Sequence, residues 1–293
     1  MKLGAMLLAP DVGNDPAVIR DHVQALDDAG MDFLTMPEHV IGGHPDRAKG
    51  EVVHTYDKPY HEPFVLFGFI AAVTQRMDLV TSILILPQRQ TVLVAKQAAE
   101  LDLLSSGRLQ LGVGVGRNWM EYEALNESFT NRGARVEEQV TVLRRLWSEE
   151  LVTFDGQWHH LDRMGLNPMP VQRPIPIWMG TFVGKVVEKV IRRIGTMADG
   201  WLAQMQPNDD FSAVRDRLLG YAREAGRDPS TIGIEGVGRI KPGDDPNDWV
   251  ANALAWRERG ATRLKVSTTG FTSPADHRAA ALSWLAAVRP ALA

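Results

Sequence analysis

The sequence contains no cysteine, no long uninterrupted apolar run and no excess of positive charge. Without cysteine, the chain can form no disulfide, no thiolate metal site and no cysteine nucleophile. No apolar run reaches the roughly 18 residues of a membrane span, and the N-terminus lacks the pattern of a secretory signal. The net charge of -4 gives no reason to expect nucleic-acid or membrane binding. We therefore expect a cytoplasmic protein that acts on a small molecule.

The remaining composition is that of an ordinary globular protein. Hydrophobic residues make up 44% of the chain and charged residues 23%. A length of 293 residues fits two average domains or one large barrel, because barrels of about 250 residues are common. The order of strands and helices along the chain has to decide between these possibilities.

Segments with strand character alternate with helical segments along the whole chain. The expected strands lie at 3–8, 33–36, 79–86, 108–113, 175–179, 200–203, 232–237 and 262–266. No repeat or low-complexity linker interrupts the alternation, which predicts an α/β fold: one closed parallel (β/α)8 TIM barrel in a single domain, 1–293. An open doubly wound sheet is the alternative. Residues 40–61 and 118–173, with a hairpin expected at 151–162, are interpreted as insertions at the C-terminal rim, where barrel enzymes place their chemistry.

The central unit of the barrel is expected at 78–117. The apolar run 79–86 is typical of a buried parallel strand, and Pro87 ends it because proline cannot donate to a sheet ladder. Thr91 can cap the next helix, and Gly107 can end it. After the short strand 108–113, Gly114 and Gly116 leave the strand end without side chains. A planar ring or a phosphate could therefore approach the backbone there.

This central unit also resembles a known family. The segment TSILILPQRQTVLVAKQAAELDLLSSGRLQLGVGVG, at 81–116, resembles the central signature of the bacterial-luciferase-like superfamily, which comprises flavin and deazaflavin enzymes on a TIM barrel. FLTMPEH at 33–39, PIPIWMGT at 174–181 and ADGWLA at 198–203 match in the same order. The resemblance covers nearly the whole chain. It implies a redox enzyme with a bound cofactor, and a homodimer formed through helices of the first half of the barrel.

Glu38 and His39 are the candidate catalytic residues. A histidine at the C-terminal end of a strand can exchange a proton during redox chemistry, or it can simply hold the following loop. The deazaflavin enzymes of the family carry an acidic residue followed by histidine here, as this chain does. Glu38 is expected either to orient His39 or to face solvent. The loop histidines His44, His54 and His61 lack metal-ligand spacing, so no metal site is predicted.

Two groups of residues are candidates for binding the cofactor ring. Ser82-Ile83 matches the position where the family often has a cis peptide bond and a bulge behind the flavin ring. The alternative is that both residues occupy ordinary core positions. Gly114-Val115-Gly116 lacks the third glycine and the downstream acid of the dinucleotide fingerprint. Its assignment to cofactor binding therefore depends on the resemblance.

A candidate phosphate site follows the fifth strand. Gly180-Thr181 precedes an expected helix start, whose free N–H groups and dipole favour an anion, and Lys185 adds positive charge one turn later. The family binds its cofactor phosphate around this position, but Lys185 can equally be a surface charge. The sugar-phosphate dehydrogenases of the family carry a glutamate after the glycines, where this chain has Arg117. That departure argues against the same sugar-phosphate reaction.

The resemblance favours the deazaflavin branch of the family. We therefore expect an oxidoreductase that transfers a hydride between coenzyme F420 and an organic substrate. An FMN-dependent monooxygenase on the same fold is the first alternative, and a non-catalytic flavin-binding barrel is the second. A metal-dependent barrel hydrolase is disfavoured, because no cluster of histidines and carboxylates recurs at several strand ends.

Overall fold

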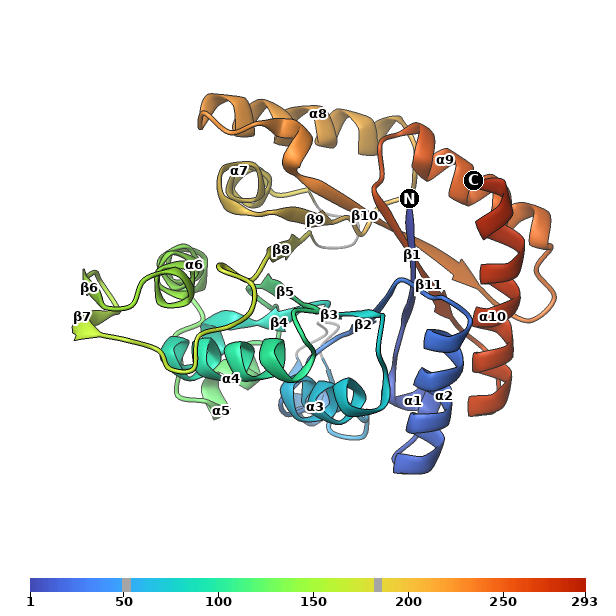
Figure 1. Cartoon of the computed structure of the whole chain (residues 1–293), viewed down its shortest axis with the longest axis horizontal. Coiled ribbons are helices and arrows are strands. Elements are labelled where there is room, and N and C mark those ends of the chain that lie inside the picture. The colour runs from blue at the N-terminus through green and yellow to red at the C-terminus, as the bar shows by residue number, and fades with distance from the viewer. Residues whose placement is uncertain (49–53, 182–185) are drawn as a thin grey trace.

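Eight parallel strand positions close into a barrel at the centre of the molecule (Figure 1). The computed structural model describes residues 1–48, 54–181 and 186–293. The barrel strands are, in chain order, β1 (Lys2–Met6), β2 (Phe33–Met36), β3 (Asp78–Thr81) continued by β4 (Leu84–Ile85), β5 (Leu109–Gly114), β8 (Ile177–Gly180), β9 (Gly200–Leu202), β10 (Gly233–Ile240) and β11 (Arg263–Thr268). The pairing of β3 and β4 with β5 closes the ring, which confirms the predicted TIM barrel and excludes the open sheet.

A layer of helices surrounds the strands (Figure 1). The long helices are α2 (Pro16–Asp28), α3 (Pro63–Val73), α4 (Thr91–Leu104), α6 (Arg132–Ser148), α7 (Glu188–Met197), α8 (Asp209–Glu224), α9 (Pro246–Glu258) and α10 (Pro274–Ala291). Shorter helical segments are α1 (Ala9–Val12), α5 (Trp119–Ala124), η1 (Pro45–Ala48), η2 (Leu86–Gln88) and η3 (Pro229–Thr231). No helix in the described part of the chain is long and apolar enough to cross a membrane.

Capping side chains begin several helices, although not α4, in which Gln90 is the N-cap and Thr91, the predicted cap, is the first helical residue. The Asp15 carboxylate accepts a hydrogen bond from the Ala17 N–H at 2.8 Å, and Ser273 accepts one from the Asp276 N–H at 3.2 Å. A proline occupies the first position of both helices, where its missing N–H costs no helical hydrogen bond. These local contacts fix the starts of α2 and α10.

The interpretation of 118–173 as one insertion was wrong, because α6 belongs to the ring of barrel helices. Its buried residues, among them Val140, Leu143 and Trp147, pack toward α4, and the Trp147 indole N–H donates to the Ala95 carbonyl at 3.0 Å. The inserted parts are α5 and the antiparallel hairpin of β6 (Val152–Asp155) and β7 (His160–Met164). The hairpin at 151–162 is thereby confirmed.

The predicted continuous strand 79–86 is broken in the middle. The peptide bond between Ser82 and Ile83 is cis, and the chain resumes pairing only at β4. The Ser82 N–H donates to the Met36 carbonyl at 2.7 Å, and the Ile85 N–H donates to the Glu38 carboxylate instead of to a strand. These contacts with the end of β2 fix the bulge at the C-terminal rim.

The interior of the barrel holds charged side chains as well as apolar ones. The Arg263 guanidinium lies 4.2 Å from the centroid of the Trp178 ring and 5.3 Å from that of Phe33. Two residues further along β11, Lys265 forms a buried ion pair with Glu235 of β10. Barrel interiors are normally filled by layers of branched apolar side chains, so this polar layer is unusual.

Candidate active site

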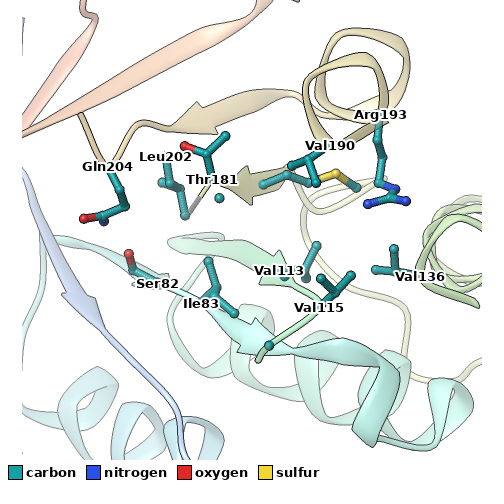
Figure 2. Close-up of a pocket in the computed structure, with 14 residues that line it drawn as sticks. Ser82, Ile83, Val113, Val115, Val136, Thr181, Val190, Arg193, Leu202 and Gln204 are labelled. Carbon is teal, nitrogen blue, oxygen red and sulfur yellow. The ribbon is translucent and has the colours of Figure 1, made fainter. Parts of the chain in front are cut away.

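A pocket of about 790 Å³ opens at the C-terminal ends of the strands that follow β2 (Figure 2). Ends of β3–β4, β5, β8 and β9 line it, together with side chains from α6 and α7. Ser82, Ile83, Gly114, Val115, Gly116, Gly180 and Thr181, all predicted as cofactor-binding residues, are among its lining residues. The structure therefore brings together every predicted cofactor-binding residue except Lys185, which lies outside the described residues.

The two ends of this pocket differ in chemistry (Figure 2). Ser82 and Gln204 present a hydroxyl and an amide at one end, which we call the inner end. Arg193 of α7 lies at the opposite end, beside Val136 of α6, and we call this the outer end. Apolar side chains line the walls between them. The pocket thus offers neutral hydrogen-bonding groups at the inner end and a cation at the outer end.

Arg193 is held in place by α6. Its guanidinium donates to the Gly133 carbonyl and to the Glu137 carboxylate, each at 2.8 Å. The Arg193 side chain is 10% exposed, whereas that of Glu137 is 50% exposed and therefore partly solvated. An anion that enters the outer end can compete with Glu137 for this guanidinium, because the competing carboxylate also interacts with water.

The glycines that line the pocket also make room for neighbouring side chains. A Cβ on Gly114 would lie 2.6 Å from the Ile83 Cδ1 atom, and a Cβ on Gly116 would lie 2.8 Å from Ile85. A Cβ on Gly180 would lie 3.2 Å from Ile83 on its other side. Gly114 and Gly180 therefore make room for Ile83, which lies between them and faces the pocket, and Gly116 makes room for Ile85. Gly114 and Gly180 thus shape the wall of the pocket through Ile83.

The expected phosphate cradle after β8 lies only in part within the described residues. The Thr181 hydroxyl accepts a hydrogen bond from the Trp201 indole N–H at 3.2 Å, which fixes Thr181 at the pocket wall. Helix α7 begins at Glu188, four residues later than predicted, and Val187 at its N-cap makes no side-chain capping bond. The predicted helix start at about Gly184 itself lies outside the described residues. Arg193 provides the observed positive charge at this pocket.

His39 lies at the edge of a second pocket, of about 650 Å³, at the C-terminal end of β2. Its Nδ1 atom lies 3.0 Å from the Glu121 carboxylate, whose other oxygen accepts the Val40 N–H at 2.8 Å. Glu121 belongs to α5 and is fully buried. A carboxylate at Nδ1 favours the tautomer that carries its proton there, which leaves Nε2 as the basic nitrogen. His39 is not among the residues that line the first pocket.

Loop residues pack around the His39 ring. The His54 ring stacks on it with centroids 4.4 Å apart, and the Tyr60 ring meets both histidines edge-on. Burial and the neighbouring His39 lower the pKa of His54. Burial and the Glu121 charge raise the pKa of Tyr60. The described part of the 40–61 loop therefore covers His39 with groups that favour their neutral forms near neutral pH.

Glu38 does not have either of the two roles predicted for it. It is only 3% exposed, and its carboxylate accepts hydrogen bonds from the Ile85 N–H and from the Arg89 guanidinium. Arg89 also donates to Glu62, the capping residue of α3, at 2.8 Å. Burial raises the pKa of Glu38 while Arg89 opposes that rise. Glu38 thus ties the end of β2 to the bulge after β3, and Glu121 is the residue that holds His39.

Three residues of the site were missed in the sequence. Glu121 lies in the first turn of a short helix three residues after Asn118, and Arg193 lies on the second turn of α7. Gln204 follows the ADGWLA segment directly. An acid beyond the glycine turn was a usable signal for Glu121, whereas nothing local distinguished Arg193 from other helix arginines. Arg117 is exposed and Asn118 is buried.

The described residues contain no group of three or more side chains that could hold a metal ion. The site therefore consists of the first pocket, with its polar inner end and cationic outer end, and of the Glu121–His39 pair at the neighbouring strand end.

Comparison with known proteins identifies the family. The model of the luciferase-like monooxygenase family matches residues 1–292. An uncharacterised protein of Mycobacterium tuberculosis is 30% identical over 70% of this chain and 71% of its own length. An F420-dependent glucose-6-phosphate dehydrogenase of Kineococcus radiotolerans is 29% identical over 86% of this chain and 72% of its own. The F420-dependent tetrahydromethanopterin reductase of Methanopyrus kandleri shares the fold, with a TM-score of 0.76, 16% identity and coverage of 99% and 98% of the two chains. The chain belongs to the luciferase-like monooxygenase family of enzymes.

Proposed function

We propose that this protein is an oxidoreductase that binds coenzyme F420 and transfers a hydride between the cofactor and an organic substrate. The observation that carries the proposal is the first pocket, an apolar slot with neutral polar groups at its inner end and a buried cation at its outer end. F420 consists of a flat deazaflavin ring and an anionic tail. Relatives described as F420-dependent support this cofactor over FMN.

The residues of the pocket fit such a cofactor. Ile83 fills the space that Gly114 and Gly180 leave and presents a branched apolar side chain to the pocket, as a flat ring requires. Ser82 and Gln204 can hydrogen-bond to the polar edge of the ring, and Arg193 can bind a phosphate of the tail. The bound cofactor supplies the hydride chemistry, and the chain supplies position and charge.

His39 is the proposed proton carrier of the reaction. With Glu121 at Nδ1, the Nε2 atom can take a proton from a substrate hydroxyl or return one to a carbonyl. Because His39 lines the second pocket and not the first, we assign the reacting group of the substrate to the β2 side of the ring. The buried Glu121 carboxylate stabilises the protonated imidazole that forms during the step.

A parallel titration with F420 and FMN tests the cofactor. Trp201 donates to Thr181 at the pocket wall, so cofactor binding is expected to change tryptophan fluorescence. A Trp201→Phe variant, whose signal change at saturating cofactor should be smaller, identifies the reporter. Tight binding of F420 with weak binding of FMN is the expected result. If neither cofactor binds, the proposal is wrong.

An FMN-dependent monooxygenase is the second candidate, and the description of the matching family favours it. In that case FMN would bind more tightly than F420 in the titration. Reduced FMN would then be consumed together with oxygen. Measurement of oxygen uptake with each reduced cofactor separates the two functions, because deazaflavins exchange hydride and react poorly with oxygen.

Substitution of His39 tests the proton step. His39→Ala should keep cofactor affinity and lower turnover about a hundredfold, the usual scale for a general acid or base. His54→Ala is the matched control, because His54 stacks on the same ring but does not contact Glu121 through a hydrogen bond in the described residues. Equal turnover of the His39 variant and the wild type would remove His39 from the mechanism.

A further inference from the structure

A buried ion pair lies inside the barrel, below the first pocket. The Lys265 ammonium is 3.0 Å from the Glu235 carboxylate, and each residue is only 1% exposed. Such a pair often stabilises a protein no better than apolar side chains of similar volume, because both charges lose their hydration. Its presence in a layer where barrels normally carry branched apolar residues therefore calls for a reason other than stability.

Lys265 connects this pair to the pocket. Its ammonium donates a hydrogen bond to the Ser82 hydroxyl at 2.8 Å, across the barrel from β11 to the end of β3. Ser82 is partly exposed and lines the inner end of the pocket. Because the Ser82 oxygen accepts from Lys265, the hydroxyl hydrogen is free to be donated to a group in the pocket. A buried positive charge is thus linked to the pocket by one hydroxyl group.

Glu235 holds Lys265 mainly through its charge. Neither oxygen of the Glu235 carboxylate has a well-aligned hydrogen bond within the described residues, although Lys265 lies within ion-pair distance. The other buried cation of β11, Arg263, is next to Asp78 at 3.4 Å and belongs to the layer below. The pair is therefore oriented with its positive end at Ser82 and its negative end at β10.

We propose that Lys265, held by Glu235, is a positioning residue that directs the Ser82 hydroxyl into the pocket and favours the reduced, anionic form of the bound ring. The inference rests on the proposed function, and it applies to a deazaflavin or a flavin alike. A hydride brings two electrons and one proton to the ring, and the electron density gathers at its pyrimidine edge. A nearby positive charge and an aligned donor stabilise that edge more in the reduced state than in the oxidised state.

The test compares the affinities of the oxidised and the reduced cofactor. Dissociation constants are measured anaerobically for F420 and for F420 reduced chemically beforehand, on the wild type and three variants. Lys265→Met combined with Glu235→Leu removes both charges of the pair together, so that neither is left buried without the other. Ser82→Ala removes only the hydroxyl and keeps the ion pair, so it remains informative if the double variant does not fold. Arg263→Met is the matched control, a buried cation of the same strand that makes no contact with Ser82.

The expected result is a change in the ratio of the two dissociation constants. In the double variant, the preference for the reduced cofactor should fall at least about tenfold. This change corresponds to a shift of about 30 mV in the reduction potential of a two-electron couple. Ser82→Ala should shift the ratio in the same direction, and Arg263→Met should leave it unchanged. If the ion pair were merely structural, its removal would weaken the binding of the oxidised and the reduced cofactor equally. If the ratio is unchanged in Ser82→Ala and in the folded double variant, the inference about Lys265 is wrong but the proposed function stands. If the wild type binds neither form of the cofactor, the proposed function is wrong and the inference about Lys265 with it.

Discussion

The contact between Gly114 and Ile83 allows a quantitative prediction about the pocket wall. In Gly114→Ala, the new Cβ would lie 2.6 Å from the Ile83 Cδ1 atom and 3.0 Å from Cγ1. Gly114 does not have a positive φ angle, so the backbone accepts alanine and the cost comes from the clash alone. Such overpacking destabilises a protein by about 1 to 3 kcal/mol. Because Ile83 is the side chain that has to move, we expect cofactor affinity to fall as well.

Ile83→Val provides the compensating change, because valine lacks the Cδ1 atom that the new Cβ would meet. By itself, Ile83→Val removes one methylene and should lower the free energy of unfolding by about 0.5 to 1.5 kcal/mol. In the double variant the two costs should not add. We expect it to be more stable than the sum of the single changes predicts, by about 1 to 2 kcal/mol.

Urea unfolding of the wild type, both single variants and the double variant gives this coupling free energy directly. Unfolding curves with equal slopes are needed, because a change in slope would indicate a change in the unfolded state. The cofactor titration on the same four proteins shows whether the pocket wall recovers. Additive free energies, within about 0.5 kcal/mol, would refute the contact between Gly114 and Ile83 as the reason for the glycine.

Three further predictions concern a positioning residue, pH and assembly. Glu121→Leu should shift His39 away from the tautomer protonated at Nδ1, which nitrogen NMR of labelled histidine measures without any substrate; an unchanged tautomer would mean that Glu121 does not hold the ring. Burial lowers the pKa of His22 from 6.5 to about 4, so the unfolded state binds the proton first and stability should fall by up to about 3 kcal/mol as the pH drops through this range. His22→Leu should flatten this slope in unfolding measurements, and a slope equal to that of the wild type would contradict the assignment. We propose that the face of α3 with Val65, 75% exposed, and Phe69, 37% exposed, forms a homodimer contact, so that glutamate at both positions should give a monomer in light scattering; an unchanged mass would count against that face.

The order of strands and helices was determined by local sequence. Apolar runs of strand length, prolines after cap residues and glycines at helix ends act over a few neighbouring residues, so they can be read without the fold. Gly114 and Gly180 likewise follow predicted strand ends, whereas the Ser82-Ile83 bulge was expected only from the family resemblance. Closure of a parallel barrel places all such strand ends on one rim, and the predicted cofactor-binding residues therefore met in one pocket.

The partners of the charged residues were decided by the tertiary structure. His39 is paired with Glu121, which lies 82 residues away, and Lys265 reaches Ser82 across 183 residues. Neither pair has a local pattern, because its distance depends on strand register and on how the ring of strands closes. Glu38 shows most clearly what local sequence cannot predict, because its neighbour in sequence is His39 but its partner in space is Arg89. A strand sends successive side chains to opposite faces, and only the closed barrel determines what each face meets.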